Sequence, residues 1–357
     1  MKQLESSVVI AASVTLAAVI FAGVFFWRQK KKQTFFYSER SLEEIEVPLK
    51  WTKVGEVSDL VIYPLKGAQK KRLEEAQFTE RGLREMQPNK ISLLDRGFVV
   101  FTEDNQFINV KKNIKLLLVD TEAVDEARVR FSFPDSEDLI VKLPIDKSTL
   151  NKIGFDLKQT VETLDCGDEA ATWFSQRLLN QQTGLRLGCF IKSLVNQRIV
   201  KDGLMEEYSK YYKKLHGDYL GAYSDMASYM LMGEESLKDL NNRLAKPVSH
   251  INFRPNILVK GSPAFSEDCW DWIKIGDNVF RGFKYCTRCI VTTINPDTAE
   301  KDPKFEPLMT LRKYRQVKED DIRKLENNSP VMGLYAGLHQ MGSGVVRIGD
   351  PIYVNTD

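Results

Sequence analysis

The sequence predicts an α+β fold that is rich in β-structure and is preceded by one transmembrane helix. Three observations lead to this prediction. Short runs of β-branched and aromatic residues recur between turn residues from about Trp51 onward, and two segments in the middle of the chain have helical spacing. Residues 8–27 form an apolar run without a charged residue. The 357 residues are enough for one large domain or two modest ones.

The apolar run from Val8 to Trp27 is the first predicted element. Its roughly 20 residues match the length of a helix that crosses the hydrocarbon of a bilayer. A basic cluster at 28–32 follows directly, and because positive flanks stay on the cytosolic side, the C-terminal bulk is expected to face the cytosol. A cleaved signal peptide would have a shorter apolar run with charge before it. Residues 1–27 are therefore predicted to be a retained anchor and residues 28–50 a basic, polar tether.

Several short segments after the tether are expected to be strands, because β-forming residues lie between turn signals. Their spacing favours a mixed or antiparallel sheet, or a barrel, over parallel βαβ units. The chain returns to this β character from Val331 onward, with a turn at 342–344. The expected strands are 59–63, 97–102, 114–119, 128–133 and 139–143, with 345–348 and 351–353 near the end.

Two helices are expected in the middle of the chain. Residues 168–179 place apolar side chains on one side, and Asp165 or Gly167 is available to cap the start. Residues 236–244 put three leucines at helical spacing, which indicates a stripe that faces the core. A third stretch, 198–214, mixes tyrosines with lysines and is either a solvated helix face over a core edge or a basic interaction surface.

Charge and cysteine content limit the classes of protein that fit. The 51 basic and 49 acidic residues leave a formal net charge of +2, so nothing indicates a nucleic-acid partner. The cysteines are odd in number and sparse, which fits a reducing compartment better than a disulfide framework. They are Cys166, Cys189, Cys269, Cys286 and Cys289.

The densest group of reactive residue types is Cys286-Thr287-Arg288-Cys289. A structural zinc site needs four ligands, and a thioredoxin-like pair expects a βαβ setting, so neither context fits well. What remains is a thiolate beside an arginine, whose positive charge lowers a cysteine pKa and favours a metal ligand or nucleophile. Two buried, unreactive cysteines are the alternative that the motif leaves open.

A second group is the segment Asn252-Phe253-Arg254-Pro255-Asn256. An arginine offers a planar fork for a phosphate or a heteroaromatic edge, and an asparagine both donates and accepts hydrogen bonds. By itself the segment could equally be a turn with a surface arginine.

A series of motifs in one order gives these groups a context. Together the motifs resemble the MOSC (molybdenum cofactor sulfurase C-terminal) domain family, including its N-terminal β-barrel-like part. With the preceding anchor, the chain looks like the mitochondrial amidoxime-reducing components of that family. The motifs are 61–66, Asp95-Arg96, 165–167, 222–225, 252–256, 267–270, 275–277, 286–289, 295–298, 306–307 and 349–351.

The resemblance implies a MOSC N-terminal domain at 51–180, a MOSC domain at 181–357, and a barrel-like fold. It also implies that molybdenum bound to molybdopterin is coordinated by Cys289, which would be both metal ligand and catalytic residue. A soft thiolate suits this metal, and cations suit the phosphate of the pterin. The cofactor-binding residues that the resemblance implies are Lys66, Gly67, Arg96, Asp225, Met226, Ala227, Arg254, Asn256, Thr287, Arg288 and Tyr335.

The activity that the resemblance implies is reduction of N-hydroxylated compounds, such as amidoximes and hydroxylamines, to amidines or amines. Electrons would come from NADH through a cytochrome b5 reductase and cytochrome b5. No Gly-x-Gly-x-x-Gly signature for a nicotinamide is present in the sequence. The implied location is the outer mitochondrial membrane, although the anchor alone would also suit the peroxisome or the endoplasmic reticulum.

Three departures from the family pattern motivate alternatives. Gly67 stands where serine is usual, Met226-Ala227 replaces Thr-Ser, and 109–112 read Asn-Val-Lys-Lys in place of Thr-Ala-Arg-Gln. These changes remove hydroxyls, and a lysine lacks the bidentate fork of arginine. The runner-up hypothesis is therefore a non-catalytic protein that binds or carries molybdenum cofactor or sulfur. A third hypothesis is a membrane-tethered adaptor that docks partners through 198–214.

Overall fold

The computed structural model describes residues 46–196, 198 and 203–355. Residues 47–357 form one compact unit. The predicted anchor at Val8 to Trp27 lies outside the described residues. Within the described ranges, no helix is both long enough and apolar enough to span a bilayer.

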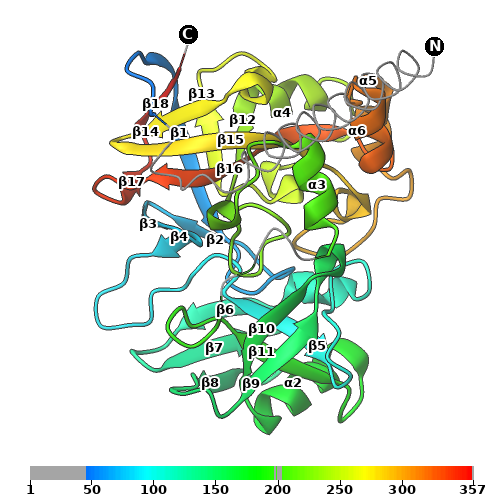
Figure 1. Ribbon diagram of the computed structural model, residues 1–357. Helices are drawn as coiled ribbons and strands as arrows, with labels where there is room; N and C mark the ends of the chain where they lie inside the picture. Colours follow the sequence, from blue (N-terminus) through cyan, green and yellow to red (C-terminus); the bar gives the residue numbers. More distant parts are fainter. Residues whose placement is uncertain (1–45, 197, 199–202, 356–357) are drawn as a thin grey trace, which may run out of the picture. The chain divides into compact units, whose positions relative to one another are not determined.

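A closed barrel of seven strands forms the C-terminal half of this unit (Figure 1). The strands are joined in the order β13-β12-β16-β15-β14-β18-β1, and pairing of β1 with β13 closes the ring. The barrel-like prediction is thus confirmed for these strands. Their bounds are β1 Thr52–Ile62, β12 Tyr229–Gly233, β13 Ile257–Lys260, β14 Trp272–Ile275, β15 Asn278–Thr287, β16 Val331–Gln340 and β18 Pro351–Val354, with the short β2 Lys71–Leu73 added to the end of β1.

Aromatic side chains fill one end of the barrel core. Phe78, Tyr229 and Phe280 meet edge to face, with ring centroids 4.7 to 5.5 Å apart. Such T-shaped contacts stabilise a core beyond the area that they bury. Phe78 comes from a small sheet, β17-β3-β4, that packs on the barrel. Its strands are β3 Glu75–Thr79, β4 Gly82–Glu85 and β17 Val345–Arg347.

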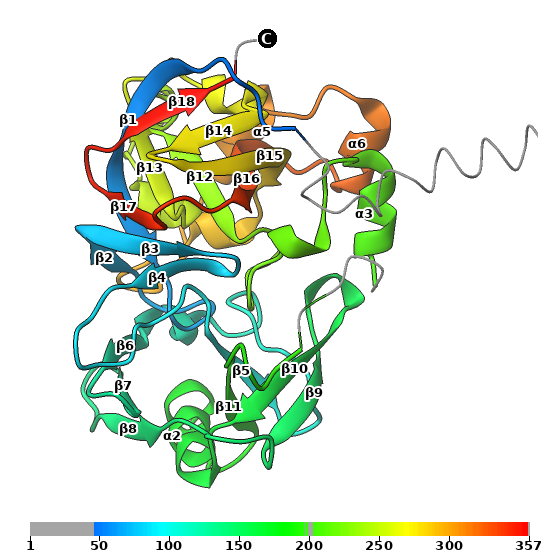
Figure 2. The same ribbon diagram turned by 60° about the vertical axis from the view of Figure 1, so that its left-hand side comes forward.

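Two further sheets and one helix lie together in the other half of the unit (Figure 2). Helix α2, Asp168–Leu179, has the predicted bounds, and it buries Trp173 and Phe174 against these sheets. Asp165 assists its start by accepting a hydrogen bond of 2.7 Å from the Gly167 amide. The strands are β5 Phe98–Thr102, β9 Leu150–Gly154, β10 Thr160–Asp165 and β11 Leu185–Cys189 in one sheet, and β6 Asp120–Ala123, β7 Arg128–Ser132 and β8 Leu139–Lys142 in the other.

The sheets do not follow the predicted division at 180/181. Strand β1 precedes the division but belongs to the barrel, and β11 follows it but belongs to the sheet of β5 and β10. The domain assignment itself remains a prediction. One predicted strand was wrong: residues 114–119 form the 3-10 helix η2, Ile114–Leu118, since the Asn113 side chain caps the Lys115 amide at 3.0 Å.

Short helices connect the strands. Helix α4 overlaps the predicted 236–244 segment over 236–241 but starts and ends earlier, and α3 lies within the 198–214 stretch. Tyr208 on α3 and Tyr212 directly after it are buried, whereas Tyr211 is exposed, so the packing interpretation of that stretch is confirmed for two of its tyrosines. The helices are α3 Met205–Tyr211, α4 Glu234–Asn241, α5 Leu308–Tyr314 and α6 Asp320–Leu325, with 3-10 helices η3 Asp156–Lys158, η4 Gly217–Tyr219, η5 His250–Phe253, η6 Ser266–Cys269 and η7 Ile290–Thr293.

Candidate functional site

A pocket of about 340 Å³ gathers most of the residues singled out in the sequence. Its lining comes from the loop after β1, the turn at Asp225, the segment before β13, the ends of β15 and β16, and the loop after β15. The predicted residues that line it are Lys66, Gly67, Arg96, Asp225, Met226, Arg254, Thr287, Arg288, Cys289 and Tyr335. The roles predicted for them remain to be tested.

The two cysteines of the motif differ in their surroundings. Cys286 is buried in an apolar cluster with Met232 and Phe253, and burial raises the pKa of its thiol despite the opposing charge of Arg288. Cys289 is half-buried and stands at the start of η7. Of the pair, Cys289 is therefore the more accessible ligand or nucleophile.

Arg288 supports the loop that carries Cys289. Its guanidinium donates to the backbone carbonyls of Phe253, at 2.8 Å, and of Met332, also at 2.8 Å from Nε. These bonds join the end of β15 to β16 and to the segment before Arg254. The arginine of the motif thus holds three pieces of the pocket wall together.

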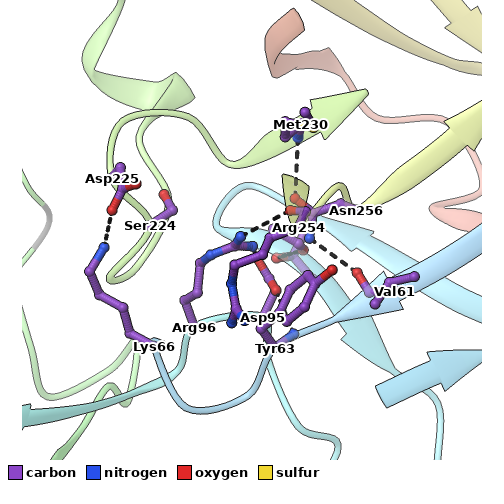
Figure 3. Close-up of polar contacts among 12 residues, drawn as sticks. Val61, Tyr63, Lys66, Asp95, Arg96, Ser224, Asp225, Met230, Arg254 and Asn256 are labelled. Atoms are coloured by element: carbon purple, nitrogen blue, oxygen red, sulfur yellow. Dashed lines mark hydrogen bonds and ion pairs between the residues drawn. The ribbon is translucent and has the colours of Figure 1, made fainter. Parts of the chain in front are cut away.

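A cluster of cations on one side of the pocket surrounds Tyr63 (Figure 3). The guanidinium carbons of Arg96 and Arg254 lie 4.9 and 3.9 Å from the centre of the Tyr63 ring. Arg96 pairs with Asp95 and donates to the Arg254 carbonyl at 3.3 Å. Both arginines have left-handed backbone conformations, with φ of 50° and 56°. Such strained residues persist where the surrounding structure fixes them, often at binding sites.

Arg254 has capacity for an anion. Its Nη2 atom is buried and finds no hydrogen-bond partner among the described residues. Burial, with the nearby positive charge of Arg96, lowers the pKa of Arg254 to about 10. A buried donor without a partner costs free energy, and an anionic oxygen at this point would remove that cost. The site therefore fits the phosphate of a pterin cofactor.

Lys66 is a further cation of the pocket lining, besides Arg96 and Arg254. Its ammonium pairs with Asp225 and lies 3.3 Å from the carboxylate of Asp156. The charge of Lys66 lowers the pKa of Asp225. The rings of Phe107 and Phe155 lie 5.1 and 5.0 Å from the ammonium, so the cation is enclosed by carboxylates and aromatic faces.

Two predicted residues support the pocket from behind its lining. The Asn256 side chain accepts a hydrogen bond from the Met230 amide and donates to the Val61 carbonyl, both at 3.2 Å (Figure 3). It thereby joins β1 to β12. Ala227 is buried and forms a bridge with Leu220. Neither residue is among those that line the pocket, and the cofactor contact predicted for each stays a prediction.

Gly67 is a departure from the family pattern that the backbone explains. Its φ is +87°, and a Cβ atom there would lie 2.9 Å from Val110 Cγ2. Only glycine adopts such a conformation without strain.

Gly67→Ser is therefore expected to lower the free energy of unfolding by about 1–3 kcal/mol in chemical denaturation. Gly261→Ser is the matched control, since Gly261 has φ +88° but its Cβ would meet the nearest atom at 3.6 Å. An equal loss at both positions would show that backbone conformation alone is responsible, and no loss at Gly67 would contradict the explanation.

Sequence reasoning missed a second polar group in the lining, made of Lys284, Glu326 and Tyr208. A lysine between Phe283 and Tyr285 in β15 was a signal that could have pointed to Lys284. Glu326 follows α6 among other charged residues, so no local pattern distinguished it. Asp156 beside Lys66 was missed for the same reason.

Comparison with known proteins gives two family matches. Residues 218–353 match the MOSC domain, and residues 54–181 match the MOSC N-terminal beta barrel domain. The chain is 35% identical to "Mitochondrial amidoxime reducing component 2" of Rattus norvegicus over 352 residues, which covers 97% of this chain and 93% of the relative. It is 33% identical to "Mitochondrial amidoxime-reducing component 1" of Homo sapiens over 308 residues, covering 85% and 83%.

Proposed function

The chain belongs to the MOSC-domain family of the mitochondrial amidoxime-reducing components, and from this premise we propose that it is a molybdenum-cofactor oxidoreductase that reduces N-hydroxylated compounds. The observation that supports this most is the pocket that holds an accessible thiol, Cys289, together with an unpartnered buried donor on Arg254. A soft ligand and an anion site in one pocket are what a metal bound to a phosphorylated pterin requires.

In this proposal different side chains of the pocket bind different parts of the cofactor. Arg254, Arg96 and Lys66 bind the phosphate, and Cys289 binds the metal. Thr287 and Tyr335 add polar contacts beside the cysteine. When bound, the cofactor supplies the two-electron redox chemistry, and the protein orients it and excludes water. Conversion of an N-hydroxyl group to N–H with release of water takes up two electrons and two protons.

The proposal extends to partners and location. Electrons come from NADH through cytochrome b5 reductase and cytochrome b5, and residues 8–27 anchor the chain in the outer mitochondrial membrane with its bulk toward the cytosol. The mitochondrial names of the relatives support this location over the peroxisome or the endoplasmic reticulum.

The test is molybdenum content and turnover of the full chain, purified from a host that makes the pterin cofactor. We expect about one molybdenum per chain and reduction of benzamidoxime when NADH, cytochrome b5 reductase and cytochrome b5 are supplied. A chain without molybdenum would contradict the proposal. Molybdenum without reduction would favour the second candidate, a cofactor carrier, which the glycine at position 67 and the carboxylates already paired with Lys66 motivate.

A further inference from the structure

A buried carboxylate connects three separate parts of the pocket wall. Glu326 directly follows α6, and its side chain is 3% exposed. Four donors, two from β15 and two from α3 and its C-terminal cap, converge on its two oxygens. They are Lys284 Nζ at 2.8 Å, Tyr212 Oη at 2.9 Å, Thr287 Oγ1 at 3.1 Å and Tyr208 Oη at 3.5 Å.

Lys284 balances the charge of this carboxylate. Its side chain is 2% exposed, and its ammonium also donates to the Tyr285 carbonyl at 3.2 Å. The rings of Tyr208, Tyr212 and Tyr335 surround the ammonium at 5.5, 5.1 and 5.7 Å. Taking two charges out of water is expensive, and buried ion pairs often contribute little to stability. A role in fixing the geometry of the pocket gives a reason for such a pair.

The phenols are suited to be permanent donors. Burial, reinforced by the negative charge of Glu326, raises the pKa of both Tyr208 and Tyr212. Both therefore keep their protons at neutral pH and donate to the carboxylate. Because Tyr208 lines the pocket and belongs to α3, its bond to Glu326 ties this helix to the pocket.

The same carboxylate reaches the metal-binding motif. Thr287 stands two residues before Cys289, and both line the pocket. One acceptor thus bonds both Thr287 at the end of β15 and Tyr208 on α3. If the carboxylate were lost, Thr287 would stay paired with Val331 of β16, whereas α3 would lose this tie to the strand.

We propose that Glu326 is a positioning residue for substrate, which holds Tyr208 of α3 and Thr287 at a fixed spacing in the pocket wall. This inference rests on the proposed function for its effect on substrate. It predicts that loss of the acceptor raises KM more than it lowers kcat, because Tyr208 in the pocket wall is released while Cys289, Thr287 and the cationic cluster keep their places.

The experiment uses two double variants of the full, cofactor-loaded chain, since a single change at Glu326 would leave Lys284 charged and buried without its partner. Lys284→Met with Glu326→Leu removes both charges and the acceptor. Lys284→Met with Glu326→Gln removes both charges but keeps one oxygen, which in the place of Oε2 accepts from Thr287 and Tyr208. Lys192→Met with Glu80→Leu is the control, because that ion pair is exposed, at 72% and 52%.

We expect the leucine variant to raise KM for benzamidoxime about tenfold with kcat changed less than about threefold, and the glutamine variant to return KM to within about twofold of wild type. Molybdenum per chain should be unchanged in all variants. Hydrogen exchange of residues 205–211, which needs no turnover, should be faster in the leucine variant and near wild type in the glutamine variant and the control.

Unchanged KM and unchanged exchange in the leucine variant would overturn the inference, and so would a lower melting temperature with KM unaltered. If the wild type holds no molybdenum and reduces nothing, the proposed function fails instead. Hydrogen exchange then still tests whether Glu326 positions α3. Faster exchange in the leucine variant supports this role, and exchange at the wild-type rate refutes it.

Discussion

Cys289→Ser is expected to abolish molybdenum binding and reduction of N-hydroxylated compounds together. The thiol of Cys289 is half-buried in the pocket, where it faces the space lined by Arg254 and Thr287. A serine hydroxyl is harder than a thiolate and stays protonated at neutral pH, so it is a poor ligand for a metal that prefers sulfur. Molybdenum should fall from about one per chain to less than about a tenth, and activity by more than about 100-fold, measured by elemental mass spectrometry and turnover.

Cys286→Ala is the matched control for this loss. Cys286 is 2% exposed in its apolar cluster and lies three residues before Cys289 in the sequence. Its removal should cost about 1 kcal/mol of stability and leave the metal in place. If the Cys286 variant loses molybdenum and the Cys289 variant retains it, the assignment of the two cysteines is reversed.

Arg254→Met is expected to weaken cofactor binding without weakening the fold of the cofactor-free protein. A charge-assisted hydrogen bond to a phosphate contributes about 2–3 kcal/mol, so the dissociation constant should rise roughly 30- to 150-fold. In the cofactor-free protein the pKa of Arg254 is lowered to about 10 by burial, which means that folding disfavours its charged form at neutral pH. In the wild type this cost to the free energy of folding is present at neutral pH and decreases as the pH rises above about 10. The methionine variant does not have it.

Cofactor release from loaded protein and thermal unfolding of cofactor-free protein measure these two effects separately. Arg347→Met serves as control, since Arg347 is 61% exposed, pairs with Glu75, and belongs to β17. A methionine variant at position 254 that unfolds at a much lower temperature while it holds cofactor normally would show that Arg254 is structural.

The sequence predicted those elements whose signals are local. Helix α2 has apolar spacing and nearby capping residues, and the strands β5, β7 and β8 lie between turn residues, so each was predicted within about a residue. The prediction of a strand at 114–119 failed because an apolar run with β-branched ends looks like a strand, whereas the capping side chain of Asn113 favours a 3-10 turn.

Closure of the barrel could not be predicted from the sequence. The pairing of β1 with β13 depends on register between segments about 200 residues apart, and no local pattern encodes that register.

The residues of the candidate site also fall into those that a local motif predicts and those that only the fold reveals. Cys289 and Arg254 stand in short motifs, and the structure brings both into one pocket. Glu326 and Asp156 are single charged residues among many, and only the fold shows that each faces a pocket lysine. Asn256 was predicted as a ligand contact because of its motif, and only the fold shows that its amide joins β1 to β12.

The late closure of the barrel has a consequence for biosynthesis. Strand β1 leaves the ribosome early, but β13 and β18, which flank it, are translated about 200 and 300 residues later. At 5–20 residues per second, β1 waits on the order of 10–60 s with unpaired backbone edges. During that time it is a template for pairing with another nascent chain. The segments between β1 and β12 can fold meanwhile, so a chain stalled before β13 would carry a folded N-terminal half and an open, aggregation-prone strand that chaperones must cover.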